Sequence, residues 1–248
     1  MHDNTIIFQL ATQYLPKVAL RIERLILTIQ EACQETHPVI HHYALNNIFE
    51  IIKLIEKPEL KSRFLKEFMR IEHALNKSTV SLPNTAFAKL FVQIQILSHL
   101  VGRFGENIHN DPFLQSMRLV QSAHSIDCEL YSPQLLLWLE NDAKPRQKDL
   151  ALWLKQLKAL NDTVSVYLSL FRETATFETV MLINGFYQCP IPSKTACQLI
   201  MVRMNKSSSI APKMQVGHHG FSIRLCDVNS MREIHNQDMT VDLSISQL

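Results

Sequence analysis

The spacing of apolar residues changes once along this chain, around the block Ile183-Asn184-Gly185-Phe186-Tyr187-Gln188. Before the block, apolar residues recur at intervals of three and four, which is typical of helices with one buried face. After Phe177 they alternate with polar residues, which indicates half-buried strands. The spacing therefore predicts an α+β protein, with a mainly helical domain over residues 11–178 and an antiparallel β-domain over residues 1–10 and 179–248.

A strand is also predicted at the N-terminus. The segment Asn4–Leu10 is short, apolar and contains β-branched residues, so it resembles a strand more than a helix start. It has no strand partner nearby in the sequence. Because two or three strands alone make a poor sheet, we expect this strand to join the C-terminal β-domain.

About seven helices are predicted between these strands. Pro38 and Pro112 each lie in an expected first turn, where the missing N–H of proline is harmless. Gly102 and Gly105 are expected to end the helix before them. The expected helices run from Lys17 to Ile29, from Pro38 to Ile55, from Leu60 to Leu75, from Pro83 to Leu100, from Pro112 to about Ala123, from Tyr131 to Glu140 and, the longest, from about Arg146 to Thr174.

Alternating stretches after the block predict half-buried strands at Gln198–Met204, Phe221–Leu225 and Thr240–Ser246. We interpret Asn205–Pro212 as the loop of a long hairpin. Gly217-His218-His219-Gly220 is expected to break or bulge the next strand. The block at the junction is interpreted as the first strand of this part of the chain, packed by Phe186 or Tyr187 and without chemistry of its own.

The composition favours a soluble globular protein. The chain has 248 residues, of which 46% are hydrophobic, enough for a substantial core. The apolar run Ile6–Leu10 is too short for a signal peptide, and no stretch approaches the roughly 20 apolar residues of a transmembrane helix. Five cysteines without a CxxC pair fit free thiols in a reducing compartment, so we expect a cytoplasmic protein that binds no membrane.

Metal and cofactor sites are not predicted. His37 and His41 lack the HExxH pattern of a zinc site, and the tail residues with ligand side chains have irregular spacing; these are Cys189, Cys197, His218, His219 and Cys226. Five glycines in all, none in a phosphate-binding loop, argue against a nucleotide site. We therefore expect no cofactor and no metal, with surface histidines and buried thiols instead.

Arg203 and Arg224 are the first candidate binding residues. Alternation places each on the strand face opposite the expected core residues. Two interpretations are open: they are solvated surface cations, or they line a groove for a peptide that carries carboxylates, together with basic residues of a neighbouring helix. Trp138 and Trp153 are interpreted as core anchors, with a dimer interface as the alternative.

Several blocks along the chain resemble a known family. They are Leu20-Arg21-Ile22-Glu23, Leu65-Lys66-Glu67, the set Pro133, Leu135, Trp138, Leu139 and Trp153, the block Asn184-Gly185-Phe186-Tyr187-Gln188, and Gly217-His218 with Ile223-Arg224. In order and spacing they resemble ZapD, the family of Z-ring-associated cell-division proteins, and they span nearly the whole chain.

The resemblance implies a bent helical domain joined to a β-domain, a homodimer and a task without catalysis. Such proteins bind the C-terminal tail of FtsZ, the tubulin-like division protein, and cross-link its filaments into bundles at midcell. The resemblance also implies a basic pocket for the tail. Arg224 occupies a matching position, and Lys57 falls where an arginine is usual, which keeps the charge but loses the bidentate fork.

Two departures from the family pattern change the expected site. The stretch Gly217–Phe221 is one residue shorter and lacks a second arginine, and Pro112 stands where a basic residue is expected. We therefore expect either weaker tail binding or a site that uses Arg203 and Arg118 in their place. The candidate tail-binding residues are Arg224, Arg203, Lys57, Arg118 and Arg21.

Two other classes of function are weighed against this one. The first is a small-molecule enzyme with an unrecognised site between the helical and β parts, although no catalytic motif is present. The second is a nucleic-acid-binding module. A formal net charge of +2, with its excess in the tail after Ile183, supports that class only weakly.

Overall fold

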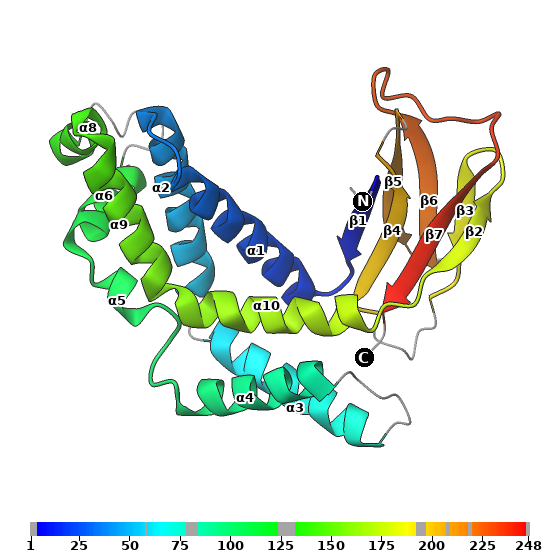
Figure 1. Ribbon diagram of the computed structural model, residues 1–248, viewed down its shortest axis with the longest axis horizontal. Coiled ribbons are helices and arrows are strands. Elements are labelled where there is room, and N and C mark those ends of the chain that lie inside the picture. The colour runs from blue at the N-terminus through cyan, green and yellow to red at the C-terminus, as the bar shows by residue number, and fades with distance from the viewer. Residues whose placement is uncertain are drawn as a thin grey trace. The chain divides into compact units, whose positions relative to one another are not determined.

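Secondary structure changes where the apolar spacing changes. A computed structural model describes residues 4–57, 59–77, 84–123, 132–191, 197–206, 209–217 and 220–246. Apart from β1 (Thr5–Ala11), the described chain is helical up to Glu173 and strand-rich from Glu178 (Figure 1). The protein is therefore of the α+β class that the spacing predicts. Within the described ranges, no helix combines the length and the apolar content that crossing a membrane requires.

Nine helices lie in the described part of the chain, close to the seven or so that the sequence predicts. They are α1 (Tyr14–Ala32), α2 (Pro38–Ile55), α3 (Glu59–Lys77), α4 (Asn84–His99), α5 (Glu106–His109), α6 (Pro112–Ala123), α8 (Pro133–Glu140), α9 (Ala143–Gln156) and α10 (Lys158–Glu173). The short α5 has no counterpart in the sequence prediction. It starts after Gly105, whose φ of 62° lies in the left-handed region.

Side-chain caps begin the helices where the sequence predicts a start. The ring of His37 accepts a hydrogen bond from the Val39 N–H, with Pro38 in the first turn of α2. At α6 the carboxylate of Asp111 accepts from the Leu114 N–H at 2.9 Å. These caps satisfy N–H groups that have no partner within the helix, which explains the positions of the helix starts.

The prediction of one long helix from Arg146 to Thr174 is wrong. The chain turns at Leu157, whose N–H bonds to the carbonyls of both Trp153 and Leu154, and α10 begins at the next residue. Trp153 before the turn and Leu160 after it are both buried. Because apolar residues continue at helical spacing through Leu157, the sequence pattern gives no sign of the break.

The chain packs into two compact units. The helical unit comprises Val18–His73 and Pro83–Tyr167, and the β unit comprises Met1–Lys17, Ala74–Leu82 and Leu168–Leu248. The predicted division into domains, meaning parts that fold independently, stays a prediction.

Aromatic residues form the interior of the helical unit. Phe64 lies edge-on to Phe104 and Tyr167, with ring centroids 6.3 and 5.4 Å apart. Trp138 and Trp153 are buried, and their indole N–H groups donate to Asp149 and Asp111. Both tryptophans are therefore core anchors, as the sequence predicts, because each buries its ring and satisfies its polar atom.

The β unit contains two antiparallel sheets. Sheet A has the strand order β1-β4-β7-β2, and sheet B has the order β3-β6-β5. Their strands are β2 (Glu178–Leu182), β3 (Phe186–Cys189), β4 (Leu199–Asn205), β5 (Ile210–Gly217), β6 (Gly220–Asp227) and β7 (Met239–Ser246). The N-terminal strand β1 pairs with β4 from Thr5 opposite Asn205 to Ala11 opposite Leu199, which confirms that it joins the C-terminal strands.

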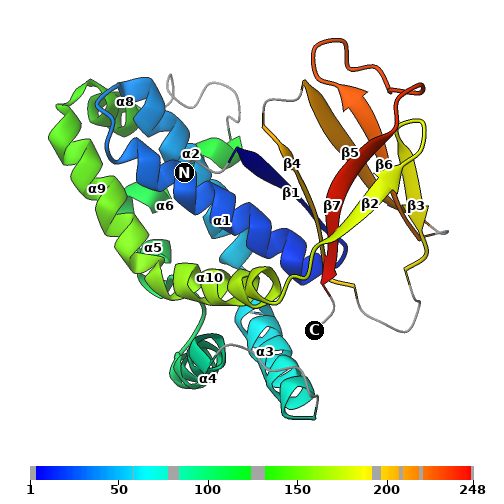
Figure 2. The same cartoon turned by 45° about the vertical axis from the view of Figure 1, so that its right-hand side comes forward.

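One apolar core joins the two sheets, which Figure 2 shows as separate layers of the β unit. Every second residue of each strand points into this core, so the inner and outer faces alternate along the strand. The core residues include Ile200, Val202 and Met204 of β4, Val241 and Leu243 of β7, and Phe221, Ile223 and Leu225 of β6. The β unit is therefore a sandwich with two outward faces, one on each sheet.

Two sequence expectations about these strands are wrong. Asn205–Pro212 does not close a hairpin, because β4 pairs in sheet A whereas β5 pairs in sheet B. Pro212 lies within β5, which is tolerated because β5 is an edge strand. β4 is buried on both faces from Leu199 to Val202 rather than half-buried. Phe171 of α10 is fully buried in the β unit and accepts a hydrogen bond from Ser246 of β7, so α10 covers part of the outer face of sheet A.

The glycine-rich stretch at residues 217–220 separates two strands. β5 ends at Gly217 and β6 begins at Gly220, and these two residues are paired in register. The expected break is therefore the end of a hairpin. His218, His219 and Cys128 lie outside the described residues.

The block at the junction forms a turn between the two sheets. Ile183 and Phe186 bridge each other, while Asn184 and Gly185 between them have φ of 52° and 71°. Two successive residues in the left-handed region define a type I′ turn, for which Asn-Gly is the preferred pair. The block does not contain the first strand of the C-terminal part, because β2 precedes it in sheet A.

Candidate functional site

Polar residues and Phe186 form two rows on the outer face of sheet B. Pairing between the strands places Phe186, Arg224 and Lys213 in one row across β3, β6 and β5. The next row contains Gln188, Ser222 and Gln215. Their neighbours in sequence, such as Ile223, point into the core, so these side chains face outward.

A groove of about 590 Å³ lies in the β unit and includes part of this face. Its lining residues include Arg224, Phe186 and Gln188 from the rows, with Leu10 from β1 and Lys17 from α1. Among the described residues that line it, the charged ones are Lys17 and Arg224. The groove therefore presents positive charge beside an aromatic ring and amide groups, which suits a ligand with carboxylates.

Arg224 is held loosely in this groove. Its guanidinium lies 4.6 Å from the centre of the Phe186 ring, which supports it by a cation–π interaction. Its Nη1 is 3.4 Å from Oε2 of Glu233, and its side chain is 44% exposed. Lys213 contacts the other oxygen of the same carboxylate, also at 3.4 Å. Ion pairs this long and this exposed contribute little, so Arg224 is free to bind another anion.

Arg203 has a different environment on sheet A. Its Nε and Nη2 lie 3.1 and 3.0 Å from Oδ2 of Asp242, and its guanidinium stacks 4.3 Å from the centre of the Phe177 ring. The Thr179 hydroxyl and the Arg203 guanidinium hold the pKa of Asp242 below its ordinary value. Arg203 and Arg224 stand on the outward faces of opposite sheets, so they do not line the same groove.

The other three candidates belong to the helical unit. Arg118 on α6 contacts Glu56 at 2.6 Å, and Arg21 on α1 pairs with Glu50. Lys57 follows the end of α2, directly after Glu56, and is exposed. Arg118 and Lys57 are therefore close to the same end of α2, whereas Arg21 meets that helix about two turns earlier. Their part in tail binding stays a prediction.

A fifth arginine, Arg146, shows how a buried cation is accommodated in the helical unit. It is 3% exposed, and it donates to His41 Nδ1, to the Thr36 and Leu139 carbonyls and to the Asn141 carbonyl. Burial, followed by the nearby Arg146 charge, lowers the pKa of His41. Since the guanidinium is surrounded by protein acceptors, this cluster holds the helices together and leaves no place for a ligand.

Sequence reasoning missed several residues of the groove. It treated Phe186 and Gln188 as structural, although Tyr187 packs against the core while its two neighbours line the groove. Alternation within the block predicts this division. Lys17 was placed at a helix start, and no local signal connects it to strands more than 160 residues away, which only the fold brings near.

No metal site is evident in the part of the chain that the structure describes. Within it, no group of three or more histidine, cysteine, aspartate or glutamate side chains is arranged to hold an ion. Burial raises the pKa of the Cys197 thiol, and likewise that of Cys189, so neither is an activated thiolate.

The described residues form an α+β chain with a helical unit and an antiparallel sandwich, and the sandwich carries an open groove with basic residues. A family model named ZapD and described as cell division protein matches residues 20–224, and the chain belongs to this family. The match runs from α1 to Arg224 of β6, so β1 and β7 lie outside it.

Curated relatives carry the same name. The chain is 25% identical over 222 residues to cell division protein ZapD of Coxiella burnetii, a match that covers 86% of each chain. It is 27% identical over 215 residues to the ZapD protein of Cupriavidus metallidurans, covering 84% of this chain and 85% of the relative. For the ZapD protein of Vibrio vulnificus the identity is 28% over 178 residues, covering 69% and 72%. These relatives support a role in cell division.

Proposed function

We propose that this protein binds the C-terminal tail of FtsZ and cross-links FtsZ filaments at the division site. The observation that carries the proposal is the groove on sheet B, in which an exposed arginine stacked on Phe186 is held only by long contacts. A peptide carboxylate would form shorter, charge-assisted hydrogen bonds with this guanidinium. Membership of the ZapD family supports the choice of partner.

Cross-linking requires at least two tail sites in one particle. A homodimer supplies them by symmetry, and two linked sites bind a filament more tightly than one site alone. We therefore propose that the working form is a dimer. Light scattering of the purified protein should give a mass of twice the 28.6 kDa of one chain. A particle that stays at the monomer mass at micromolar concentration would rule out this route to bundling.

The proposal is tested by sedimentation with FtsZ filaments. FtsZ is assembled with GTP, mixed with this protein and pelleted, and a parallel sample uses FtsZ without its C-terminal tail. We expect the protein in the pellet only with the complete FtsZ, together with bundles visible by electron microscopy. Sedimentation that is equal with and without the tail would show that the tail is not the ligand.

Salt provides a second test of the same contact. The proposed interaction joins exposed charges, which are screened over a Debye length of about 8 Å at physiological ionic strength. Co-sedimentation should therefore decrease as sodium chloride rises from low to high concentration. A contact that is insensitive to salt would point to an apolar surface rather than to Arg224.

A further inference from the structure

Glu233 contacts both cations of the row Phe186, Arg224 and Lys213 on sheet B. Its Oε1 is 3.4 Å from Lys213 Nζ, and its Oε2 is 3.4 Å from Arg224 Nη1. One carboxylate thus serves two cations, each at a distance longer than the 2.7–2.9 Å or so of a strong charge-assisted hydrogen bond. Arg224, which lines the groove, therefore already has a weakly bound carboxylate of the protein itself beside it.

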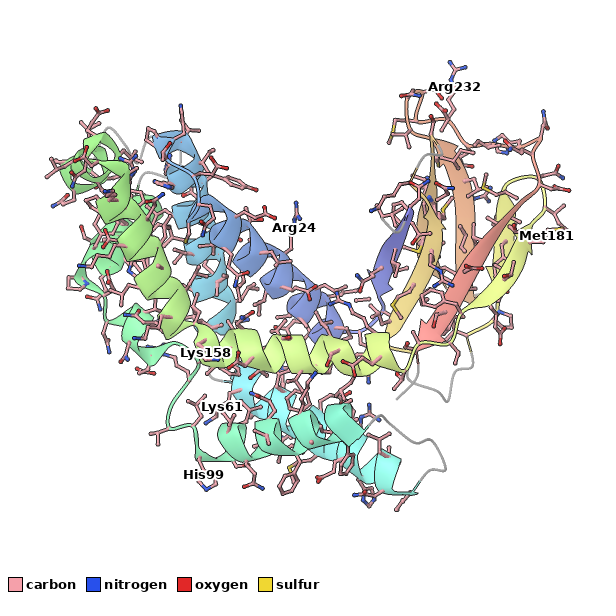
Figure 3. All side chains as sticks on the ribbon, in the orientation of Figure 1. Arg24, Lys61, His99, Lys158, Met181 and Arg232 are labelled. Carbon is pink, nitrogen blue, oxygen red and sulfur yellow. The ribbon has the colours of Figure 1, made fainter. Side chains whose placement is uncertain are left out.

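The backbone positions this carboxylate. Glu233 is bridged to Cys226, and next to it the Ile234 N–H donates to the Leu225 carbonyl at 2.9 Å. The segment around Glu233 therefore extends sheet B alongside β6. Because Cys226 and Arg224 are two residues apart on one strand, they share the outer face, and Glu233 opposite Cys226 is directed to that face as well. Its neighbour Arg232 projects away from the strands (Figure 3).

Gly185 of the junction block allows this segment to lie so close. The Gly185 carbonyl accepts from the Leu225 N–H at 2.9 Å, and a Cβ at Gly185 would lie 2.1 Å from the Ile234 carbonyl oxygen. Any larger residue would push the segment and its glutamate away from β6. The position of Glu233 is therefore part of the fold and is not the chance position of a surface side chain.

We propose that Glu233 is a built-in competitor for the carboxylate of the bound peptide. This inference rests on the proposed function, because it places the tail's carboxylate on Arg224. In the structure Glu233 lies between Arg224 and Lys213, in the position that a ligand carboxylate would take. A ligand carboxylate displaces it by forming shorter bonds to the same guanidinium, whereas a neutral peptide cannot, so Glu233 makes the groove selective for acidic ligands.

The test compares Glu233→Gln with Glu178→Gln. Glutamine keeps the size of the side chain and removes the charge. Glu178 is an exposed residue of sheet A in the same unit, so its variant has the same net charge and serves as the control. Two fluorescent probes are titrated by anisotropy at low salt: a synthetic FtsZ tail peptide, and decaglutamate, which tests carboxylate binding without reference to FtsZ.

We expect Glu233→Gln to bind both probes roughly threefold more tightly than the control, the size expected for releasing exposed ion pairs. The gain should vanish when Arg224→Ala is added, since the effect acts through that guanidinium. Equal decaglutamate affinities for the two glutamine variants would overturn the inference, even if the FtsZ tail binds normally. If decaglutamate distinguishes the variants but the FtsZ tail binds none of them, the competitor role stands and the proposed partner is wrong.

Discussion

Arg203 and Arg224 are two versions of one arrangement on opposite sheets. Each stands on the outward face of a strand, stacks on a phenylalanine ring at 4.3 or 4.6 Å and faces one acidic residue. The acid of Arg203 lies within 3.1 Å and is also held by Thr179, whereas the acid of Arg224 lies at 3.4 Å and is shared with Lys213. Arg203 is therefore a closed pair, and Arg224 is an open one.

The difference shows how strand pairing decides whether a cation on a sheet has a close anionic partner. In sheet A, Asp242 lies directly opposite Arg203 on the neighbouring strand, so the pair is short and cross-strand. In sheet B, the position opposite Arg224 on β5 is Lys213, and the carboxylate arrives from a connecting segment. Two neighbouring positive charges attract an anion from outside the two strands. Here that anion is the Glu233 carboxylate or, by our proposal, a carboxylate of the ligand.

A third arginine, Arg146, is more completely enclosed by protein groups than Arg203 or Arg224. We expect its substitution to have the largest effect on stability. Arg146→Leu in the helical unit would leave the buried carbonyls of Thr36, Leu139 and Asn141 without donors. Each such group costs about 1–3 kcal/mol, so we expect the free energy of unfolding to fall by about 3 kcal/mol or more. Urea denaturation measures this change. A loss below about 1 kcal/mol would mean that the burial of a cation does not indicate how much it contributes to the stability of the fold.

Arg224→Ala should reduce affinity for the FtsZ tail peptide by roughly tenfold to a hundredfold. Hydrogen bonds to a charged group contribute about 1.5–3 kcal/mol, and about 1.4 kcal/mol corresponds to a factor of ten. Calorimetric titration gives the affinity, and a thermal melt should show little change. Arg232→Ala, which removes an outward-pointing arginine of the same unit, is the control. Equal affinities for the two variants would remove Arg224 from the site.

Arg203→Ala should lower the stability of the protein without changing its affinity for the tail peptide. The substitution removes a short ion pair in which the arginine side chain is 38% exposed. We therefore expect the free energy of unfolding to fall by about 1 kcal/mol. The affinity for the tail peptide should stay unchanged, because Arg203 lies on the other sheet. A loss of affinity as large as that of Arg224→Ala would contradict the assignment of the two arginines to separate roles.

The phenylalanine rings stacked on the two arginines should show the same difference between binding and stability, with smaller effects. Phe186→Leu removes the ring beneath Arg224, and a cation–π contact at an exposed site contributes about 0.5–1 kcal/mol. Tail affinity should therefore weaken about twofold to fivefold. Phe177→Leu, the matched change beneath Arg203, should alter the melting temperature and leave the affinity as it was. The comparison fails if the two substitutions affect binding equally.

Acid should weaken the closed pair. The pKa of Asp242 is lowered in the folded protein, so its charge stabilises the fold at neutral pH. This contribution is present above the ordinary value of 3.8 and is lost as the pH falls through the lower folded value. Asp242→Asn should therefore melt at a lower temperature than the unaltered protein at pH 7, and the gap should close toward pH 3. A gap that stays constant with pH would show that the carboxylate charge does not stabilise the pair.

Sequence reasoning succeeded where structure depends on neighbours in the chain. The caps at His37 and Asp111 and the strand at Thr5–Ala11 all follow from local patterns. It failed at Leu157, because apolar spacing continues through the turn there. It failed again at Asn205–Pro212, since alternation identifies a strand without identifying its partner.

The candidate site was found only in part for the same reason. Arg224 was identified by alternation and by family resemblance, and the structure places it in the groove. Arg203 has the same local pattern, and nothing in its immediate sequence reveals Asp242, which is 39 residues away. Glu233 was not considered, because its role depends on a backbone bridge to Cys226 that no sequence pattern marks.

By itself the sequence determined the α+β class, most of the helices and strands, the family and the position of the junction between helices and strands. These depend on periods of 3.6 and two residues and on the φ preferences of single residues, which are local properties. The tertiary structure alone decided that the Asn184-Gly185 turn leads from sheet A into sheet B, that Gly185 makes room for the segment carrying Glu233, and that one of two similar arginines is closed and the other open. Which charges meet depends on strand pairing between distant segments, and that pairing is decided when the whole core packs.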